Sequence, residues 1–389
     1  MTRDRLVTLL ASRHFQAVVA AIVVVVLAGL IYAGQQELMA KGIVSGFDFL
    51  WRSTGWDIGF SLIPYSISDP YWKVLLIGLM NTLFLGFAGL ALATLVGVLV
   101  GVARTSHNPV LNAIGTIYVE TFRNVPLILQ AFFWYAVYTH LPPPRRAIEF
   151  GDAIFLSARG IYLPGFNISN GAIAICAVLL VVGIVAALWL ISSRRLTGWA
   201  EARRLPLAGL ALVVAAIAIF LVGEAGRIAD QPVISMPELR GLNIRGGLRL
   251  TSEFAALLTA MSLYGGAYLG EIIRAGFLSI PKGQIEAAKA LGFRPFHIFT
   301  LVRLPLAIRA ILPTLTNQYV WLIKATTLGI AVGFSDFFLV ISTSINQSGQ
   351  TVELLLILMG GFLLINYTIG TVMNAINRSI AIKGQGTRK

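Results

Sequence analysis

Eight long apolar runs divide the chain, and the segments between them carry most of its charged residues. A run of about 20 apolar residues is long enough to cross a bilayer as a helix. The pattern therefore predicts eight membrane-spanning helices, over residues 15–33, 75–102, 111–138, 172–191, 205–222, 254–273, 310–332 and 354–375. A signal peptide has a shorter apolar core and a small-residue cleavage site, so we expect the first span to be retained.

Composition supports this assignment to an all-α integral membrane protein. Only 12% of the 389 residues are charged, against about 25% in soluble domains. The net charge of +13 is dispersed over loops between apolar spans rather than gathered on one helix or aromatic face, which argues against nucleic-acid binding. Cys176 is the single cysteine and lies in an apolar run, so it forms no disulfide within the chain. The four histidines are far apart, and no metal site is predicted.

The charged loop between the sixth and seventh runs predicts a helix-turn-helix knob. Residues 284–291 hold no Pro or Gly and are rich in helix formers, and Gly292 can take the positive φ that ends a helix. Pro295 suits the first turn of a second helix. We expect that helix to end at about Leu304, because Pro305 disfavours a helical conformation in the residue before it. An ordinary basic cytoplasmic loop is the alternative.

The spacing within this loop resembles the EAA loop of ABC importer membrane subunits. Glu286-Ala287-Ala288 is followed after three residues by Gly292, and after nine more by Val302-Arg303-Leu304-Pro305. The resemblance implies that the loop, residues 281–305, contacts a cytoplasmic ATPase. The residues that it implies for this coupling are Gly283, Glu286, Ala287, Ala288, Leu291, Gly292, Leu304 and Pro305.

Polar side chains inside two apolar runs are the candidates for a substrate path, because ionisable groups are costly within a membrane and must face protein or water. In the third run Glu120 and Arg123 are three residues apart, so they either pair with each other or line the path. In the seventh run the polar side chains either pack against neighbouring helices or line the path, and Pro313 can kink the helix. The path candidates are Glu120, Arg123, Gln130, Asn317, Gln318, Lys324 and Thr326.

A second resemblance narrows the family. The polar amino-acid subfamily of these permeases, which imports histidine, glutamate, glutamine, arginine and opines, has a similar pattern to Gly78, Thr82, Tyr118, Glu120, Arg123, Pro126, Leu127 and Gln130. The resemblance implies a type I ABC importer transmembrane fold. It further implies a permease for polar or general L-amino acids, similar to the larger membrane subunit of a broad-specificity system.

This resemblance also implies partners. They are a second, homologous membrane subunit, an ATPase dimer that binds ATP and Mg, a periplasmic amino-acid-binding protein and membrane lipid. The chain itself contains no G-x-x-x-x-G-K-[ST] phosphate loop, so no cofactor is expected in it and hydrolysis is assigned to the partner.

The runs divide the chain into five parts. These are an N-terminal span with a periplasmic segment, a first core part, an insertion with two extra spans, a second core part and a cytoplasmic tail, over residues 1–71, 72–140, 141–250, 251–378 and 379–389. Lys and Arg are more numerous in the segments on the amino-terminal side, so the positive-inside rule places both termini in the cytoplasm of a bacterial inner membrane. The insertion pair, within residues 172–222, is almost free of polar residues and is expected to be peripheral.

Two other function classes fit less well. An ion-coupled secondary amino-acid transporter would need coupling-ion sites and commonly an internal repeat, and the halves of this chain show no convincing repeat. A membrane-embedded enzyme would need a cluster of His, Asp or Cys at the ends of the spans, which the sequence does not suggest. We therefore expect a transport subunit and no enzyme.

Overall fold

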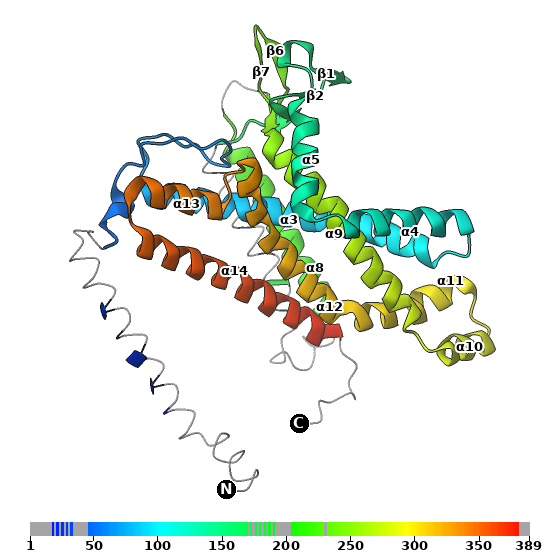
Figure 1. Ribbon diagram of the computed structural model, residues 1–389. Helices are drawn as coiled ribbons and strands as arrows, with labels where there is room; N and C mark the ends of the chain where they lie inside the picture. Colours follow the sequence, from blue (N-terminus) through cyan, green and yellow to red (C-terminus); the bar gives the residue numbers. More distant parts are fainter. Residues whose placement is uncertain are drawn as a thin grey trace.

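The structure is a computed structural model that describes residues 46–169, 204–228 and 232–380, with isolated positions between 18 and 33 and between 172 and 190. Within the described residues, five helices are long and apolar enough to cross a membrane (Figure 1): Tyr71–Thr105, Pro206–Ala225, Ser252–Leu278, Pro295–Val332 and Thr351–Asn374. Most of the predicted first and fourth spans, and the tail from 381, lie outside the described residues.

The centre of the fold is the crossing of α3 (Tyr71–Thr105) with α9 (Ser252–Leu278). A side chain added at Gly97 would place its Cβ 2.6 Å from the Cβ of Leu269, and one at Gly101 would lie 2.8 Å from Ile273. The two backbones therefore approach more closely than any larger residue allows. Gly97 and Gly101 are four residues apart, the spacing that lets membrane helices pack closely.

The third predicted span, 111–138, is wrong as a single helix. It consists of α4 (Pro109–Asn124) and α5 (Leu127–Thr139), which run in different directions (Figure 1). Pro126 disfavours a helical conformation in the preceding residue, and Val125 is accordingly extended. The side-chain amide of Gln130 donates to Phe122 O at 2.8 Å and to Val125 O at 2.9 Å, so it satisfies carbonyl groups that the break leaves without helical partners.

The loop after α9 contains the predicted turn at Gly292, but its second helix does not end where the sequence predicts. Helix α10 (Lys282–Ala290) is followed by Gly292 with φ +77°, as predicted. The next helical turn, α11 (Pro295–His297), passes through a π-helical segment, η3 (Ile298–Arg303), directly into α12 (Leu304–Lys324). The prediction that the second helix ends at about Leu304 is wrong. The wider π-helical turn leaves room for the ring of Pro305, which sits in the first turn of α12 where its missing N–H is tolerated.

The span predicted at 310–332 is not one regular helix, because α12 ends at Lys324. A 3₁₀-helix, η4 (Ala325–Val332), leads to a short helix that the apolar pattern does not indicate, α13 (Phe337–Ser348). Asp336 caps α13, because its Oδ1 accepts a hydrogen bond of 2.8 Å from Leu339 N. Helix α14 (Thr351–Ile380) then contains the predicted eighth span.

The insertion forms a small β cap, which we define as residues 148–166 and 234–250 (Figure 1). A four-stranded antiparallel sheet has the order β1 (Ile148–Phe150), β2 (Ile154–Ser157), β3 (Gly160–Leu163) and β8 (Leu248–Leu250). Two further pairs join β4 (Gly165–Phe166) to β5 (Ile234–Ser235) and β6 (Glu238–Arg240) to β7 (Asn243–Arg245). The short 3₁₀ turn η2 (Pro144–Arg146) connects α5 to the cap. Because β8 leads straight into α9, the cap and α10 lie at opposite ends of α9.

The segment before α3 contacts the core through Phe60. A 3₁₀ turn, η1 (Asp48–Trp51), begins this segment. The ring of Phe60 lies 5.2 Å from the ring of Phe254 and 5.6 Å from that of Phe334. Its carbonyl accepts a hydrogen bond of 2.9 Å from the amide of Asn81, which also donates to Ser335 O at 2.8 Å. One buried amide therefore connects this segment, α3 and the approach to α13.

Candidate functional site

Three aromatic side chains form a continuous strip across α9 and α12, which we call the aromatic strip: Tyr264, Tyr268 and Trp321. The ring centres of Tyr264 and Tyr268 are 4.7 Å apart, as expected for residues four apart on a helix, and Trp321 stacks on Tyr264 at 5.4 Å. Trp321 is 41% exposed. The strip therefore presents ring surface outward from the middle of α9 and the C-terminal part of α12.

A cation from α4 lies at one end of the aromatic strip. The guanidinium carbon of Arg123 is 5.5 Å from the ring centre of Tyr268, within the range of a cation–π interaction. The polar positions of α12 continue the surface beyond Trp321. Asn317, Trp321 and Lys324 are spaced i, i+4 and i+7, so they share one face of the helix, and all three are exposed.

The expected pairing of Glu120 with Arg123 is wrong. No ion pair involving either residue occurs among the described residues. Arg123 instead lies over Tyr268, and the amide of Asn124 donates to Glu120 O at 2.7 Å and to Glu120 Oε2 at 3.3 Å. Both side chains are exposed, so neither charge needs the other to offset burial.

The structure separates the path candidates into two groups. Arg123, Asn317 and Lys324 adjoin the aromatic strip, with Glu120 one helical turn from Arg123 and Gln318 half-buried beside Asn317. Gln130 and Thr326 are buried and bonded to nearby backbone. Gln130 supports the α4–α5 break, and the hydroxyl of Thr326 donates to Ile323 O at 2.8 Å. Both of these side chains have structural partners, so they do not add to the exposed face.

Sequence reasoning missed the aromatic strip. The spacing of Tyr264 and Tyr268 was visible as an i, i+4 pair on the sixth span. Nothing in the sequence relates that pair to Trp321 or Arg123, because the contacts join helices that are far apart along the chain.

A charged cluster holds the ends of α3 and α9 together near α10. Both carboxylate oxygens of Glu271 are used: Oε1 accepts from Arg274 Nη2 at 2.7 Å, and Oε2 pairs with Arg104 Nη1. The backbone carbonyl of Arg104 also accepts from Asn112 on α4 at 2.7 Å. This end of the helix pair is therefore cross-linked to the start of α4.

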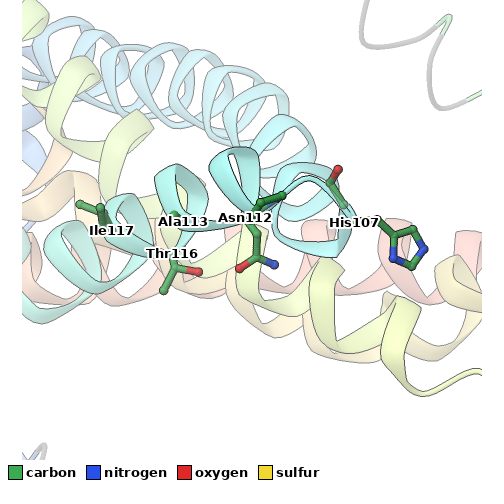
Figure 2. Close-up of a pocket in the computed structure, with 7 residues that line it drawn as sticks. His107, Asn112, Ala113, Thr116 and Ile117 are labelled. Atoms are coloured by element: carbon green, nitrogen blue, oxygen red, sulfur yellow. The ribbon is translucent and has the colours of Figure 1, made fainter.

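A hollow of about 520 Å³ lies at the turn between α3 and α4 (Figure 2). Figure 2 shows His107 extending away from α4, while Asn112 and Thr116 lie along the helix. Asn108 closes the turn, because its Oδ1 accepts from Val110 N at 2.9 Å. The amide of Asn112 is already bonded to Arg104 O. The hollow contains none of the predicted site residues.

The loop 281–305 projects from the end of α9 and exposes apolar side chains. Leu291 is 74% exposed, Phe296 is 72% exposed and Leu301 is 61% exposed. Ile285 and Phe299 pack against a cluster of buried side chains from α9 and α12, which fixes the knob to these helices. Large apolar side chains gathered on a projecting loop are typical of a protein–protein contact.

The predicted coupling residues occupy different parts of this knob. Gly283, Glu286, Ala287, Leu291 and Gly292 are exposed on α10 and its turn, whereas Ala288 is buried beneath them and Leu304 and Pro305 are half-buried at the start of α12. Glu286 is the fifth of the nine residues of α10 and lies outside its first turn, so it is not placed to interact favourably with the positive end of the helix dipole. A Cβ at Gly292 would meet no atom within 4 Å, so only its positive φ restricts this position.

Comparison with known proteins gives the family. Residues 93–382 match the family described as "Binding-protein-dependent transport system inner membrane component". The chain is 39% identical over 373 residues to the "Putative amino-acid ABC transporter permease protein YhdX" of Escherichia coli K12, covering 95% of this chain and 93% of that protein. The chain belongs to this family of transport-system inner membrane components.

Two further relatives are similar along most of their length. The chain is 36% identical to the "General L-amino acid transport system permease protein AapQ" of Rhizobium johnstonii, over 89% of this chain and 86% of that protein. It is 34% identical to the "Glutamate/glutamine/aspartate/asparagine transport system permease protein BztB" of Rhodobacter capsulatus, over 97% of each. The predicted class, a helical membrane permease rather than an enzyme, is confirmed by this family.

Proposed function

We propose that this chain is a permease subunit of an ATP-driven ABC importer for L-amino acids in a bacterial inner membrane. The names of the three relatives support an amino-acid substrate. The observation that carries the proposal is the knob 281–305, which exposes Leu291, Phe296 and Leu301 on the far side of α9 from the β cap. A transporter that worked alone would have no use for such a surface.

In this proposal the knob contacts a separate ATPase dimer, which binds ATP and Mg. The basic residues Lys282, Lys289 and Arg294 are exposed on the same loop and suit an acidic rim on that partner. The two termini and the knob are cytoplasmic. The β cap then faces the periplasm, where an amino-acid-binding protein delivers substrate.

The aromatic strip and its flanking polar residues form the translocation face in this proposal. Charged side chains at membrane depth must face protein or water, and Arg123 and Lys324 are both exposed. A second, homologous membrane subunit facing this surface would enclose a polar path and keep lipid away from it. The remaining apolar surface, including α8 (Arg204–Ala225), contacts lipid.

The test is uptake into proteoliposomes that contain the complete complex. We expect uptake of labelled L-amino acids that requires the ATPase, ATP inside the vesicles and the binding protein outside them. Imposed ion gradients should have no effect. Uptake driven by an ion gradient without the ATPase would contradict the proposal and favour an ion-coupled secondary transporter.

A further inference from the structure

We propose that the aromatic strip, with Arg123 at one end and Lys324 beyond the other, selects amino acids that carry no cationic side chain. The inference rests on the proposed function and names the substrate class that the translocation face accepts. Arg123 binds the substrate carboxylate, Tyr268 is a positioning residue for Arg123, and Lys324 repels a side-chain cation.

Arg123 has hydrogen-bond donors to offer to a substrate. Its guanidinium lies 5.5 Å from the ring centre of Tyr268, and no ion pair of this residue occurs among the described residues. A ring beneath a guanidinium holds the group in place but satisfies none of its N–H donors. These donors remain available for a carboxylate, which a guanidinium binds with two parallel hydrogen bonds.

Every α-amino acid also carries an ammonium group, and Glu120 is placed to bind it. Glu120 lies three residues before Arg123 on α4, so the two side chains share one side of the helix. Its carboxylate is exposed and has only a long hydrogen bond, 3.3 Å, from Asn124. A cation and an anion on one exposed helix face, unpaired with each other, match the carboxylate and the ammonium of a zwitterion.

The side chain of the substrate would lie along the rest of the aromatic strip. From Tyr268 the strip continues through Tyr264 to Trp321 with ring centres 4.7 and 5.4 Å apart. Ring surface gives contact to apolar and polar side chains alike, because it needs no specific hydrogen-bond partner. Lys324 shares the exposed face of Trp321. A carboxylate near this ammonium is favoured, a neutral amide is tolerated, and a second cation is repelled.

Aromatic rings also attract cations, which would favour lysine or arginine as substrates. Here the Tyr268 ring already has a guanidinium over it. A cationic side chain on the rest of the strip would lie between Arg123 and Lys324, and the carboxylate of Glu120 offsets only one of these two positive charges. The net positive charge of this face therefore favours acidic and neutral amino acids over cationic ones.

The experiment measures equilibrium binding of labelled L-glutamate and L-glutamine to the complete membrane complex in nanodiscs, without the binding protein, and competition by L-arginine. We expect Arg123→Gln to raise both dissociation constants by about tenfold or more, since a charge-assisted hydrogen bond is lost. Lys324→Gln should weaken glutamate binding, leave glutamine binding unchanged and improve competition by arginine. Tyr268→Phe should bind normally, because the ring is kept, whereas Tyr268→Leu should weaken both ligands.

Arg145→Gln is the matched control, because Arg145 is an exposed arginine beside the β cap and away from the strip. If the Arg123→Gln complex does not assemble, Arg123→Lys and Lys324→Gln carry the test. Unchanged affinities and unchanged arginine competition in assembled variants would overturn the selectivity role alone. Absence of ATP-dependent uptake by the unaltered complex would instead overturn the proposed function.

Discussion

At the scale of single residues, Gly292 is restricted by its backbone and not by its surroundings. Its φ is +77°, and an added Cβ would meet nothing within 4 Å. A β-branched residue in this conformation costs on the order of 1–3 kcal/mol, whereas Asn tolerates it. We expect Gly292→Val to reduce co-purification of the ATPase and Gly292→Asn to retain it.

The control for this prediction is Gly349→Val. Gly349 has a similar φ, +73°, and equally open surroundings, but it lies between α13 and α14. Gly349→Val should therefore strain the backbone without releasing the ATPase. Equal retention of the ATPase by Gly292→Val and by the unaltered chain would show that the turn geometry does not matter for coupling.

Glu120 and Arg123 give a second prediction at this scale. Because each has partners other than the other residue, the effects of Glu120→Gln and Arg123→Gln on the free energy of unfolding should add. A double-mutant cycle in detergent should give a coupling energy below about 0.5 kcal/mol. If the double variant is much more stable than the sum of the two single effects predicts, Glu120 and Arg123 do form the ion pair that the sequence suggested.

At the scale of helices, the α3–α9 crossing depends on glycine. A Cβ at Gly97 would lie 2.6 Å from the Cβ of Leu269, so even Gly97→Ala must displace the helices and should cost about 1–3 kcal/mol. Gly370→Ala is the control, because a Cβ there meets nothing within 4 Å on α14. The measurement is the thermal stability of the purified subunit. Equal thermal unfolding midpoints for Gly97→Ala and Gly370→Ala would contradict the close crossing.

The elements that sequence predicts well are those with local causes. Apolar length predicts α3, α9 and α14, and the glycine at 292 predicts the turn after α10. The break at Pro126 also had a local signal in the sequence, namely the proline itself. The overall apolar character of residues 111–138 nevertheless led to the prediction of one span. The strands of the β cap are two to four residues long, too short for an alternating pattern to emerge.

The candidate site was predictable only in part, for a related reason. The cost of an intramembrane charge identifies Arg123 and Lys324 from sequence alone. Their relation to each other depends on Tyr264, Tyr268 and Trp321, which come together through the packing of three helices. Burial likewise decides that Gln130 supports a helix break, and burial cannot be read from an apolar run.

At the scale of the whole molecule, we expect the insertion pair to be separable from the core. Only 6% of the most apolar stretch of α8, 18 residues long, is buried. The ends of the pair meet, because Ser169 N donates to Gly226 O at 2.7 Å. Removing residues 170–225 with a short linker should therefore preserve the β cap and ATP-driven uptake. Complete loss of uptake at normal membrane amounts would show that the pair belongs to the transport path.

The central claim is that the knob 281–305 meets the ATPase on the side of the membrane opposite the β cap. Cys176 is the single cysteine, so a Cys176→Ser background accepts one labelled position at a time. Leu291 on the knob and Phe166 on the cap are similarly exposed, at 74% and 70%. A benzophenone attached through Leu291→Cys should cross-link to the ATPase in the assembled complex, and the same group at Phe166→Cys should not. Cross-linking from Phe166→Cys, or none from Leu291→Cys in an assembled complex, would contradict the account.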